Sequence, residues 1–194
     1  MSRTLFAASA MLGLALTACS QAEDSTMVAT AEAEPAGPVQ IAIDEWNVAW
    51  DGRPRDPYTL DGDTVWFVGQ ANSYIARLDV ASGEMERIDL REGAGPHNLI
   101  LNPDGDVWYA GNRDAHIGFY DVDAGRFSYV DTPRDIARDP HTLIMDAAGD
   151  IWFSSQQANA IGRLTVETGE LDLLTVPTDR SRPYGIKIAP DGMI

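Results

Sequence analysis

Cysteine and positive charge are scarce in this sequence of 194 residues. Cys19 is the only cysteine, so no disulfide can form within the chain. The 14 Lys and Arg residues are outnumbered by 30 Asp and Glu residues, and the net charge of −16 makes nucleic acid and anionic lipid headgroups unsuitable partners. A Ser-His-Asp arrangement, a phosphate-binding loop and a Cys-based metal motif are also missing. These absences exclude a disulfide scaffold, a nucleic-acid-binding protein and a P-loop enzyme.

The N-terminus has the pattern of a signal peptide. After Arg3, the run LFAASAMLGLAL is apolar but too short to span a membrane as a helix. It ends in LTAC, Leu16 to Cys19, which resembles a bacterial lipobox, a motif whose Cys becomes the lipid-modified first residue after cleavage. Ser20 follows, as in lipoproteins sent to the outer membrane. We expect a lipoprotein signal peptide over residues 1–18 and lipidation of Cys19, with an ordinary secretory signal as the alternative.

The expected location is therefore the cell envelope of a Gram-negative bacterium. Lipidated Cys19 would anchor the protein to the outer membrane, facing the periplasm or the surface. Residues 19–38 are rich in Ala, Glu, Ser and Pro without apolar periodicity, and we interpret them as a flexible tether. Residues 39–194 are expected to form the folded domain.

Three landmarks recur together in this domain. They are the prolines Pro57, Pro96, Pro140 and Pro183, the tryptophans Trp66, Trp108 and Trp152, and the glycines Gly83, Gly125 and Gly169. The period is about 43 residues, and a fixed period of this length indicates a solenoid, an array or a propeller. No stretch after residue 20 has apolar residues at helical spacing over three turns, which argues against a helical solenoid.

The unit from Pro96 to Asp139 contains four short strand patterns. They are HNLILNP, DVWYAGN, HIGFYDVDAG and RFSYVDTP, and an Asp-Gly turn signal separates the first two. Four strands in a unit of this length are typical of a β-propeller blade. We predict an all-β fold, a β-propeller of four-stranded blades.

The fourth unit, RPYGIKIAPDGMI, stops where its second strand should begin. We therefore expect a C-terminally truncated propeller domain with three blades and the first strand of a fourth. The segment IAIDEWNV, Ile41 to Val48, aligns with GELDLLTV and is expected to be an outermost strand that lacks its own blade. Because a propeller closes only when all blades are present, open sheet edges are expected.

Several phrases carry a family resemblance. GPHNLILNPDGDVWYAGNRDAHIGFYD, DPHTLIMDAAGDIWFSSQQANAIGRLTVETGELDLLTVP and RPYGIKIAPDG resemble the repeats of the streptogramin B lyase family, virginiamycin B lyase and its relatives. The resemblance covers about residues 41–194 and implies a seven-bladed propeller. It also implies a carbon–oxygen lyase, and hence antibiotic resistance: family members linearise a cyclic depsipeptide by eliminating across its ester bond, with Mg²⁺ assistance.

Strand order predicts where the candidate site lies. In each blade, the entry to the innermost strand and the loop between the second and third strands lie on the same face. The channel mouth on that face should be lined in order by Tyr58, His97, His141 and Tyr184. Further substrate-binding candidates on this face are Asn112, Arg113, Gln156, Arg138 and Arg182. Eight arginines lie in its loops, and they either bind an acidic group of a ligand or pair with neighbouring acids.

Asp139 precedes His141 by two residues, and a carboxylate beside an imidazole raises its basicity or helps it to hold a cation. We predict His141, His97 and Asp139 as the catalytic set, and Asp139 with His141 as ligands of Mg²⁺. The resemblance implies that family histidines occupy this register, although the catalytic set falls in later blades. A structural role at the strand entry is the alternative for both histidines.

The sequence departs from the family pattern at one recurring position. Family blades often carry a Glu two residues after a Trp-Phe pair, but that place holds Gly69, Gly111 and Ser155. His116 occurs in one unit only, and we predict that it lies on the surface. The recurring tryptophans are predicted to pack between blades.

Three functions are consistent with the sequence. The first is a lyase acting on a cyclic depsipeptide or lactone, as a monomer when the protein is complete. The second is a propeller that binds a peptide, glycan or protein partner without catalysis. The third is a hydrolytic propeller lactonase, but the strands do not place at the channel the cluster of acids and Asn that such enzymes use to hold a metal.

Overall fold

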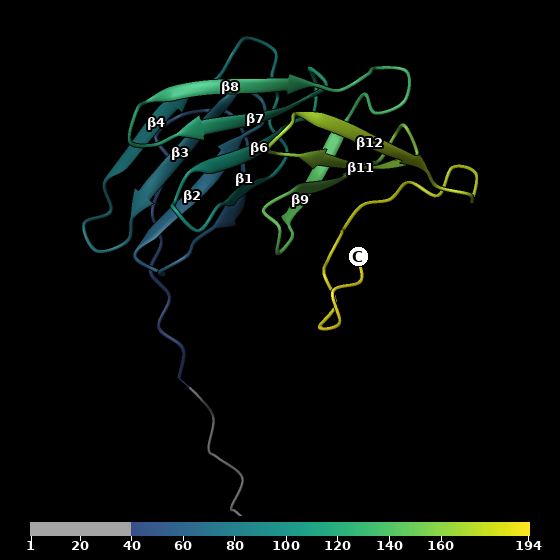
Figure 1. The fold of residues 1–194 in the computed structure, drawn as a ribbon. Helices are drawn as coiled ribbons and strands as arrows, with labels where there is room; N and C mark the ends of the chain where they lie inside the picture. The colour runs from purple at the N-terminus through teal and green to yellow at the C-terminus, as the bar shows by residue number, and fades with distance from the viewer. Residues whose placement is uncertain (1–39) are drawn as a thin grey trace, which may run out of the picture. The chain divides into compact units, whose positions relative to one another are not determined.

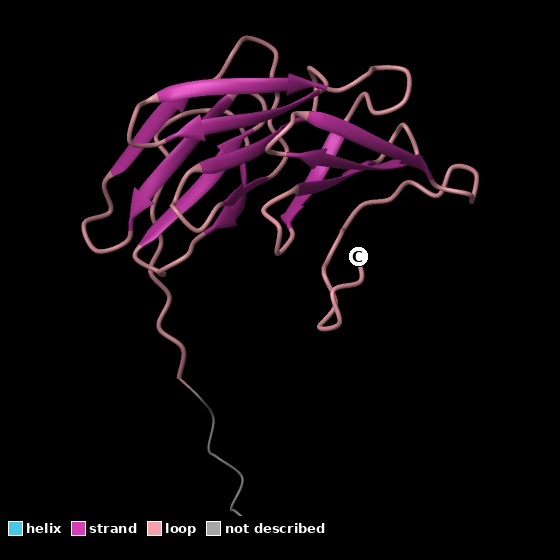
Figure 2. Ribbon diagram, in the orientation of Figure 1, coloured by secondary structure: helices cyan, strands magenta, loops and turns pink. Residues whose placement is uncertain are grey.

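The computed structural model describes residues 40–194. The predicted signal peptide, Cys19 and the tether lie outside these residues, and the boundary at residue 39 stays a prediction. The described residues contain strands and loops, and no helix (Figure 2). Residues 40–194 accordingly include no helical segment with the length and apolar character needed to cross a bilayer.

Twelve strands form three antiparallel sheets, each of four strands that are consecutive in sequence (Figure 1). The first sheet contains β1 (Pro54–Tyr58), β2 (Thr64–Gly69), β3 (Tyr74–Asp79) and β4 (Met85–Asp89). The second contains β5 (Leu99–Leu101), β6 (Val107–Gly111), β7 (His116–Asp121) and β8 (Arg126–Asp131). The third contains β9 (Pro140–Met145), β10 (Ile151–Ser155), β11 (Ala160–Thr165) and β12 (Glu170–Thr175). These are the predicted propeller blades, and we call them blades 1, 2 and 3.

Short polar turns connect the first two strands of a blade. In blade 2 the side-chain oxygen of Asn102 accepts hydrogen bonds from the backbone of Asp104 and Asp106, at 3.1 and 2.8 Å. In blade 3 Asp146 does the same for Ala148 and Asp150. Such side-chain turns fix the hairpin without large apolar residues.

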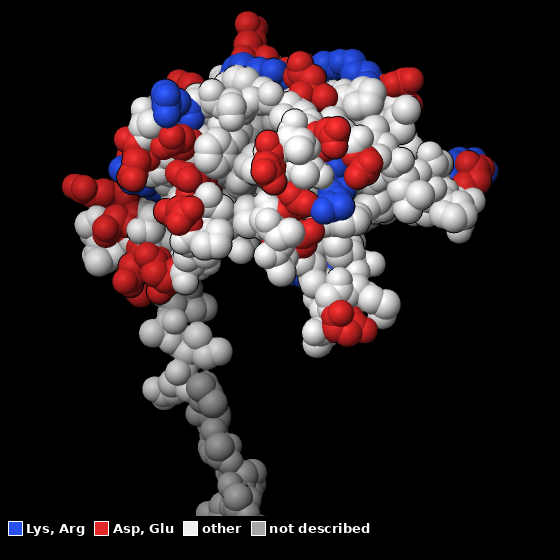
Figure 3. Space-filling model, viewed as in Figure 1, with Lys and Arg blue, Asp and Glu red and all other residues white. Residues whose placement is uncertain are grey.

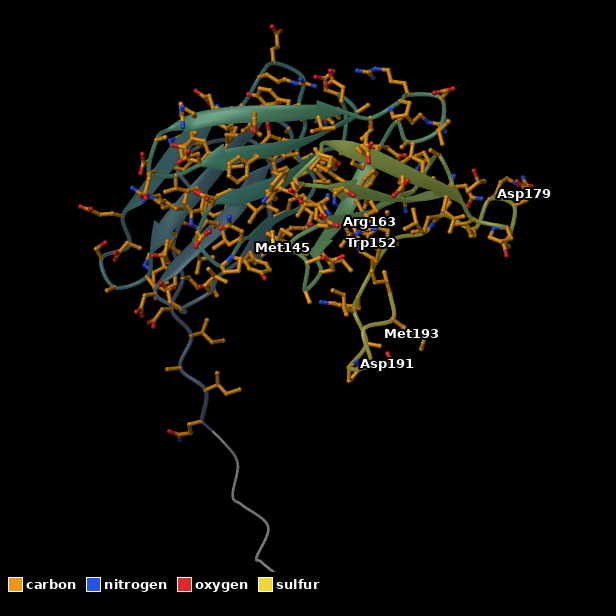
Figure 4. All side chains as sticks on the ribbon, viewed as in Figure 1. Met145, Trp152, Arg163, Asp179, Asp191 and Met193 are labelled. Atoms are coloured by element: carbon orange, nitrogen blue, oxygen red, sulfur yellow. The ribbon has the colours of Figure 1, made fainter. Side chains whose placement is uncertain are left out.

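The blades pack face to face through apolar cores. Trp66 of blade 1 packs with Leu99 and Tyr109 of blade 2, and Trp108 of blade 2 packs with Leu143 and Phe153 of blade 3. Burial of Trp66 and Trp108 confirms that these tryptophans pack between blades. The equivalent Trp152 is partly buried, and Arg163 lies over its ring at 5.6 Å (Figure 4).

The innermost strands meet along one side of the sheets, because β5 contacts both β1 and β9. A groove of about 390 Å³ runs along them, lined by Tyr58, Asn98, Ile100, Thr142 and Ile186 among others. The connection that enters each innermost strand and the loop between its second and third strands therefore approach one another at one end of this groove.

Two predicted strands are absent from the structure. Residues 184–189, predicted as the first strand of a fourth blade, form no strand, although Gly192 and Ala189 close a turn there through a 2.9 Å hydrogen bond. Residues 41–48, predicted as an outermost strand, also form none. A strand needs a hydrogen-bonding neighbour, and no described strand pairs with either segment.

Candidate functional site

His97, His141 and Tyr184 meet at one end of the groove, although successive repeat units provide them. The ring centroids of the two histidines are 3.4 Å apart with an interplanar angle of 36°. The Tyr184 ring lies 4.2 Å from His141 and 6.3 Å from His97, measured between centroids. These three residues and Tyr58 were predicted to line the channel mouth, and the structure brings His97, His141 and Tyr184 into contact.

Backbone pairing fixes both histidines. The His97 amide donates to the carbonyl of Ala110 at 2.9 Å, which extends the pairing of blade 2 beyond β5. His141 is the second residue of β9, and its Nδ1 lies 3.1 Å from the hydroxyl of Thr142. Both imidazoles are buried, with 7% and 3% of their residue surface exposed.

A loop anchored on blade 3 carries Tyr184 to the histidines. The Ser154 hydroxyl donates to the Tyr184 carbonyl at 2.6 Å. Asn159, in a left-handed conformation with φ of 59°, holds the same loop through Val176, Thr178 and Arg182. Asn tolerates this conformation better than most residues. Tyr184 itself is 54% exposed, so one side of the cluster faces solvent.

Asp56 lies against His97 and was not among the site residues predicted from the sequence. Its Oδ2 is 3.5 Å from Nδ1 of His97, and its Oδ1 accepts a hydrogen bond from Nε of Arg55 at 3.3 Å. The β1–β2 register is irregular between Arg55 and Tyr58, and Asp56 has a φ of 47°. This irregularity places the carboxylate of Asp56, not the ring of Tyr58, against His97.

The charges at the cluster are unequally distributed. Burial, followed by the positive charges of His97 and Arg55, lowers the pKa of His141 to about 4. Burial acts to raise the pKa of Asp56, but contact with His97 and the charge of Arg55 outweigh it and hold that pKa below its usual value. Near pH 7 the cluster thus contains a neutral His141 and an ionised Asp56.

The carboxylate of Asp139 forms its hydrogen bonds with the loop between β10 and β11. Its Oδ1 accepts from the Ser155 hydroxyl at 2.8 Å and from the amide of Ala158 at 3.2 Å, while Oδ2 accepts from the amide of Gln157 at 2.6 Å. The carboxylate therefore closes the loop between β10 and β11. Its predicted partnership with His141 is not among the hydrogen bonds of the described residues.

The remaining predicted binding residues are dispersed. Tyr58 lines the groove and is 37% exposed. The side-chain amide of Asn112 donates to the backbone carbonyl of Pro140 at 3.0 Å, and the Arg138 side chain donates to the backbone carbonyl of Gln157 at 2.8 Å. The side chain of Arg113 packs beside Gly95. Gln156 and Arg182 lie in loops on the same face, the first partly buried and the second exposed.

The prediction that His116 lies on the surface is wrong. Its side chain is fully buried between Tyr109 and Tyr129, with Nε2 3.3 Å from the Tyr109 hydroxyl. The reason is Gly111, which pairs with His116 across β6 and β7 and leaves room for the ring. Tyr74 fills the same space over Gly69 in blade 1. These rings occupy the place where a family Glu would project.

The described residues do not fit the predicted Mg²⁺ site. No group of three or more His, Cys, Asp or Glu side chains within residues 40–194 is placed to hold a metal ion. Mg²⁺ prefers oxygen ligands, and both oxygens of Asp139 accept hydrogen bonds from its own blade. The prediction of Mg²⁺ rests on the family resemblance alone.

Many arginines of this face pair with neighbouring acids. Ion pairs link Arg55 with Asp56, Arg91 with Asp114 and Asp131, Arg134 with Asp114, and Arg180 with Asp179. Arg113, Arg138 and Arg182 take part in none of the ion pairs found in residues 40–194. Carboxylates are spread over the face shown in Figure 3, with few cations among them.

The comparisons with known proteins agree with this arrangement. Residues 58–194 match the model of the virginiamycin B lyase family. The chain belongs to that family. No match was found among curated protein sequences.

Solved structures show the same fold. A streptogramin B lyase structure is 26% identical, with a TM-score of 0.70 over 77% of this chain. The virginiamycin B lyase of Staphylococcus aureus is 25% identical, with a TM-score of 0.67 over 74% of this chain. A catalytically inactive variant of that lyase, with quinupristin, is 24% identical with a TM-score of 0.68 over 75% of this chain. The chain spans about half the length of these proteins, at 49%, 48% and 49%.

Proposed function

We propose that the protein is a lyase that opens a cyclic depsipeptide or related lactone by eliminating its ester, with the cluster of His97, His141 and Tyr184 at the reacting ester. The observation that supports this most is the close contact of two buried histidine rings, 3.4 Å between centroids, beside a solvent-facing tyrosine. Membership of the virginiamycin B lyase family supports the reaction class.

Such an elimination needs a base more than a nucleophile. The base removes a proton from the carbon next to the one that bears the ester oxygen. The C–H electron pair forms a double bond, the C–O bond breaks, and the ester leaves as a carboxylate. An uncharged imidazole within reach of that proton supplies the base. Tyr184 offers an aromatic face to the ring of the depsipeptide.

We also propose a location for the protein. A lipid on Cys19 would hold it at the outer membrane, where an antibiotic enters the cell. We include Mg²⁺ in this proposal because the family resemblance implies it. The described residues provide no site for the ion, so the steps above do not involve it.

A second function is favoured by one observation. The positions of the family Glu are filled by the rings of Tyr74 and His116, and Asp139 is bound within its loop. If the same holds throughout the protein, the cluster binds a peptide-like or glycan ligand without turnover.

Liquid chromatography with tandem mass spectrometry distinguishes these functions, because a linear isomer separates and fragments differently from the cyclic substrate. The protein is incubated with a streptogramin B such as quinupristin, with Mg²⁺ or with a chelator. Elimination gives a linear product of unchanged mass, because no atom is added, whereas hydrolysis adds one water. A linear isomer supports the lyase. Binding without any ring opening, across a panel of cyclic esters, contradicts it and favours the binding function.

A further inference from the structure

Asp56 has a backbone conformation that L-residues rarely adopt. Its φ is 47°, and it precedes Pro57 at the irregular point of β1. Strained residues of this kind persist where the surroundings hold them, and they gather at functional sites. Gly95 occupies the same place before Pro96 in the next unit, with the same φ of 47°, so glycine satisfies the backbone there without strain.

The carboxylate of Asp56 is held in place from both sides. Arg55 donates to Oδ1 through Nε, and its own Nη1 donates to the buried Gln70 at 3.1 Å. Oδ2 then lies 3.5 Å from Nδ1 of His97. That nitrogen is buried and has no hydrogen-bond partner within the described residues. The carboxylate of Asp56 is the acidic group found in contact with it.

We propose that Asp56 controls the proton of this site: it keeps a hydrogen on Nδ1 of His97 and so makes Nε2 of His97 the atom that accepts a proton. The hydrogen bond made by one ring nitrogen determines the tautomer of the whole ring. When Nε2 takes a proton, the positive charge on the ring lies next to the carboxylate. This inference rests on the proposed function and names which of the two histidines is the base.

The neighbours of His97 agree with this assignment. Within residues 40–194 no ion pair joins His141 to a carboxylate, and its Nδ1 faces the Thr142 hydroxyl. Burial together with the charges of His97 and Arg55 outweighs the opposing charges of Asp56 and Asp139 and disfavours its protonation. Two stacked imidazolium rings would repel each other. When the elimination delivers a proton to this pair, the carboxylate of Asp56 beside Nδ1 favours His97 as the ring that receives it.

Other members of the repeat show that this arrangement is not a requirement of the fold. Gly95 has no side chain to offer, and Asp139 directs its oxygens to Ser155, Gln157 and Ala158. Blades 2 and 3 form without a carboxylate against a histidine at this place. Asp56 is thus a positioning residue specific to the cluster.

The test is nitrogen-15 NMR of the histidine rings in the full chain, at a pH where the imidazoles are neutral. In the native protein we expect His97 in the Nδ1–H tautomer. Asp56→Gly removes the carboxylate in a backbone that suits glycine, and we expect the Nδ1–H form to become a minority. Asp56→Asn keeps an oxygen acceptor, so we expect it to retain most of that form. Asp135→Asn changes an exposed acid on the same face and should leave His97 unaltered.

An Nε2–H tautomer in the native protein, or an unchanged tautomer in Asp56→Gly, would overturn the inference. Circular dichroism of each variant shows whether it is folded, and if Asp56→Gly does not fold, the native spectrum alone decides. This measurement needs no substrate, so its result does not depend on whether the protein catalyses the elimination. A protein with the expected tautomer that opens no cyclic ester would refute the lyase and leave the control by Asp56 intact.

Discussion

The imidazole of His116 occupies the space that any side chain at residue 111 would need. A Cβ built on Gly111 would lie 2.0 Å from the ring carbon Cε1 of His116, and one built on Gly69 would lie 2.1 Å from the ring of Tyr74. Both rings are fully buried, so neither has room to move. The two glycines are therefore required by packing.

Substitution of these glycines should destabilise the fold strongly. We expect Gly111→Ala and Gly69→Ala each to lower the free energy of unfolding by about 2 kcal/mol or more, because overpacking a filled core costs about 1–3 kcal/mol. Gly185→Ala is the matched control, since nothing lies within 4 Å of a Cβ there. Urea denaturation measures all three, and equal midpoints for Gly111→Ala and Gly185→Ala would refute the packing account.

Stability should depend on pH through the buried histidines. Burial, followed by the charge of Arg91, lowers the pKa of His116 from 6.5 to about 4. The unfolded chain then binds protons that the folded chain does not, so stability is full above about pH 6.5 and falls as the pH drops towards 4. His116 alone accounts for a loss of about 3 kcal/mol over that window.

The repeat itself supplies a variant for this test. Tyr74 has the same place in blade 1, so His116→Tyr puts an aromatic ring there that stays neutral throughout the window. We expect its unfolding free energy to fall less steeply between pH 6.5 and 4 than that of the native protein. Parallel curves for the two proteins would show that His116 is not the titrating group. Carboxylates with lowered pKa values, such as Asp131 and Asp146, act below this window.

Asp139 should matter for stability more than for proton transfer. Its replacement by Ala leaves the amides of Gln157 and Ala158 and the Ser155 hydroxyl without their acceptor. An unsatisfied buried group costs about 1–3 kcal/mol, so we expect Asp139→Ala to lower the free energy of unfolding by at least about 2 kcal/mol. The exposed Asp135→Ala is the control. A variant as stable as the native protein, but without turnover, would restore Asp139 to the catalytic set.

Much of the fold could be predicted from the sequence because each repeat unit has the same pattern of strands, turns and packing residues. The period of the prolines and tryptophans predicted repeated blades, and the strand patterns within one unit predicted four strands in each. The register of His97 and His141 predicted that both line the same channel mouth. The burial of His116 was also within reach: Gly69 pairs with Tyr74 and Gly111 pairs with His116, a glycine opposite a ring in both blades, whereas blade 3 pairs the small residues Ser155 and Ala160. Size complementarity between paired positions was the overlooked signal.

Asp56 could not be found in this way. Its contact with His97 depends on a left-handed residue and a shift in the β1–β2 register, and neither is encoded by the period. The loss of the strand over residues 184–189 has a similar cause, because strand formation depends on a neighbour and not on the pattern alone.

The central claim is that the histidine cluster performs the elimination, and turnover of quinupristin by matched variants tests it most directly. The rate of appearance of the linear isomer is measured for the native protein, His97→Ala, His141→Ala and Asp135→Ala, each shown to be folded. We expect His97→Ala to lower kcat by roughly 100-fold or more, since a positioned base contributes about 10²–10⁴-fold. His141→Ala should lower it less, and Asp135→Ala should leave it unchanged. Native turnover that persists in His97→Ala would contradict the account.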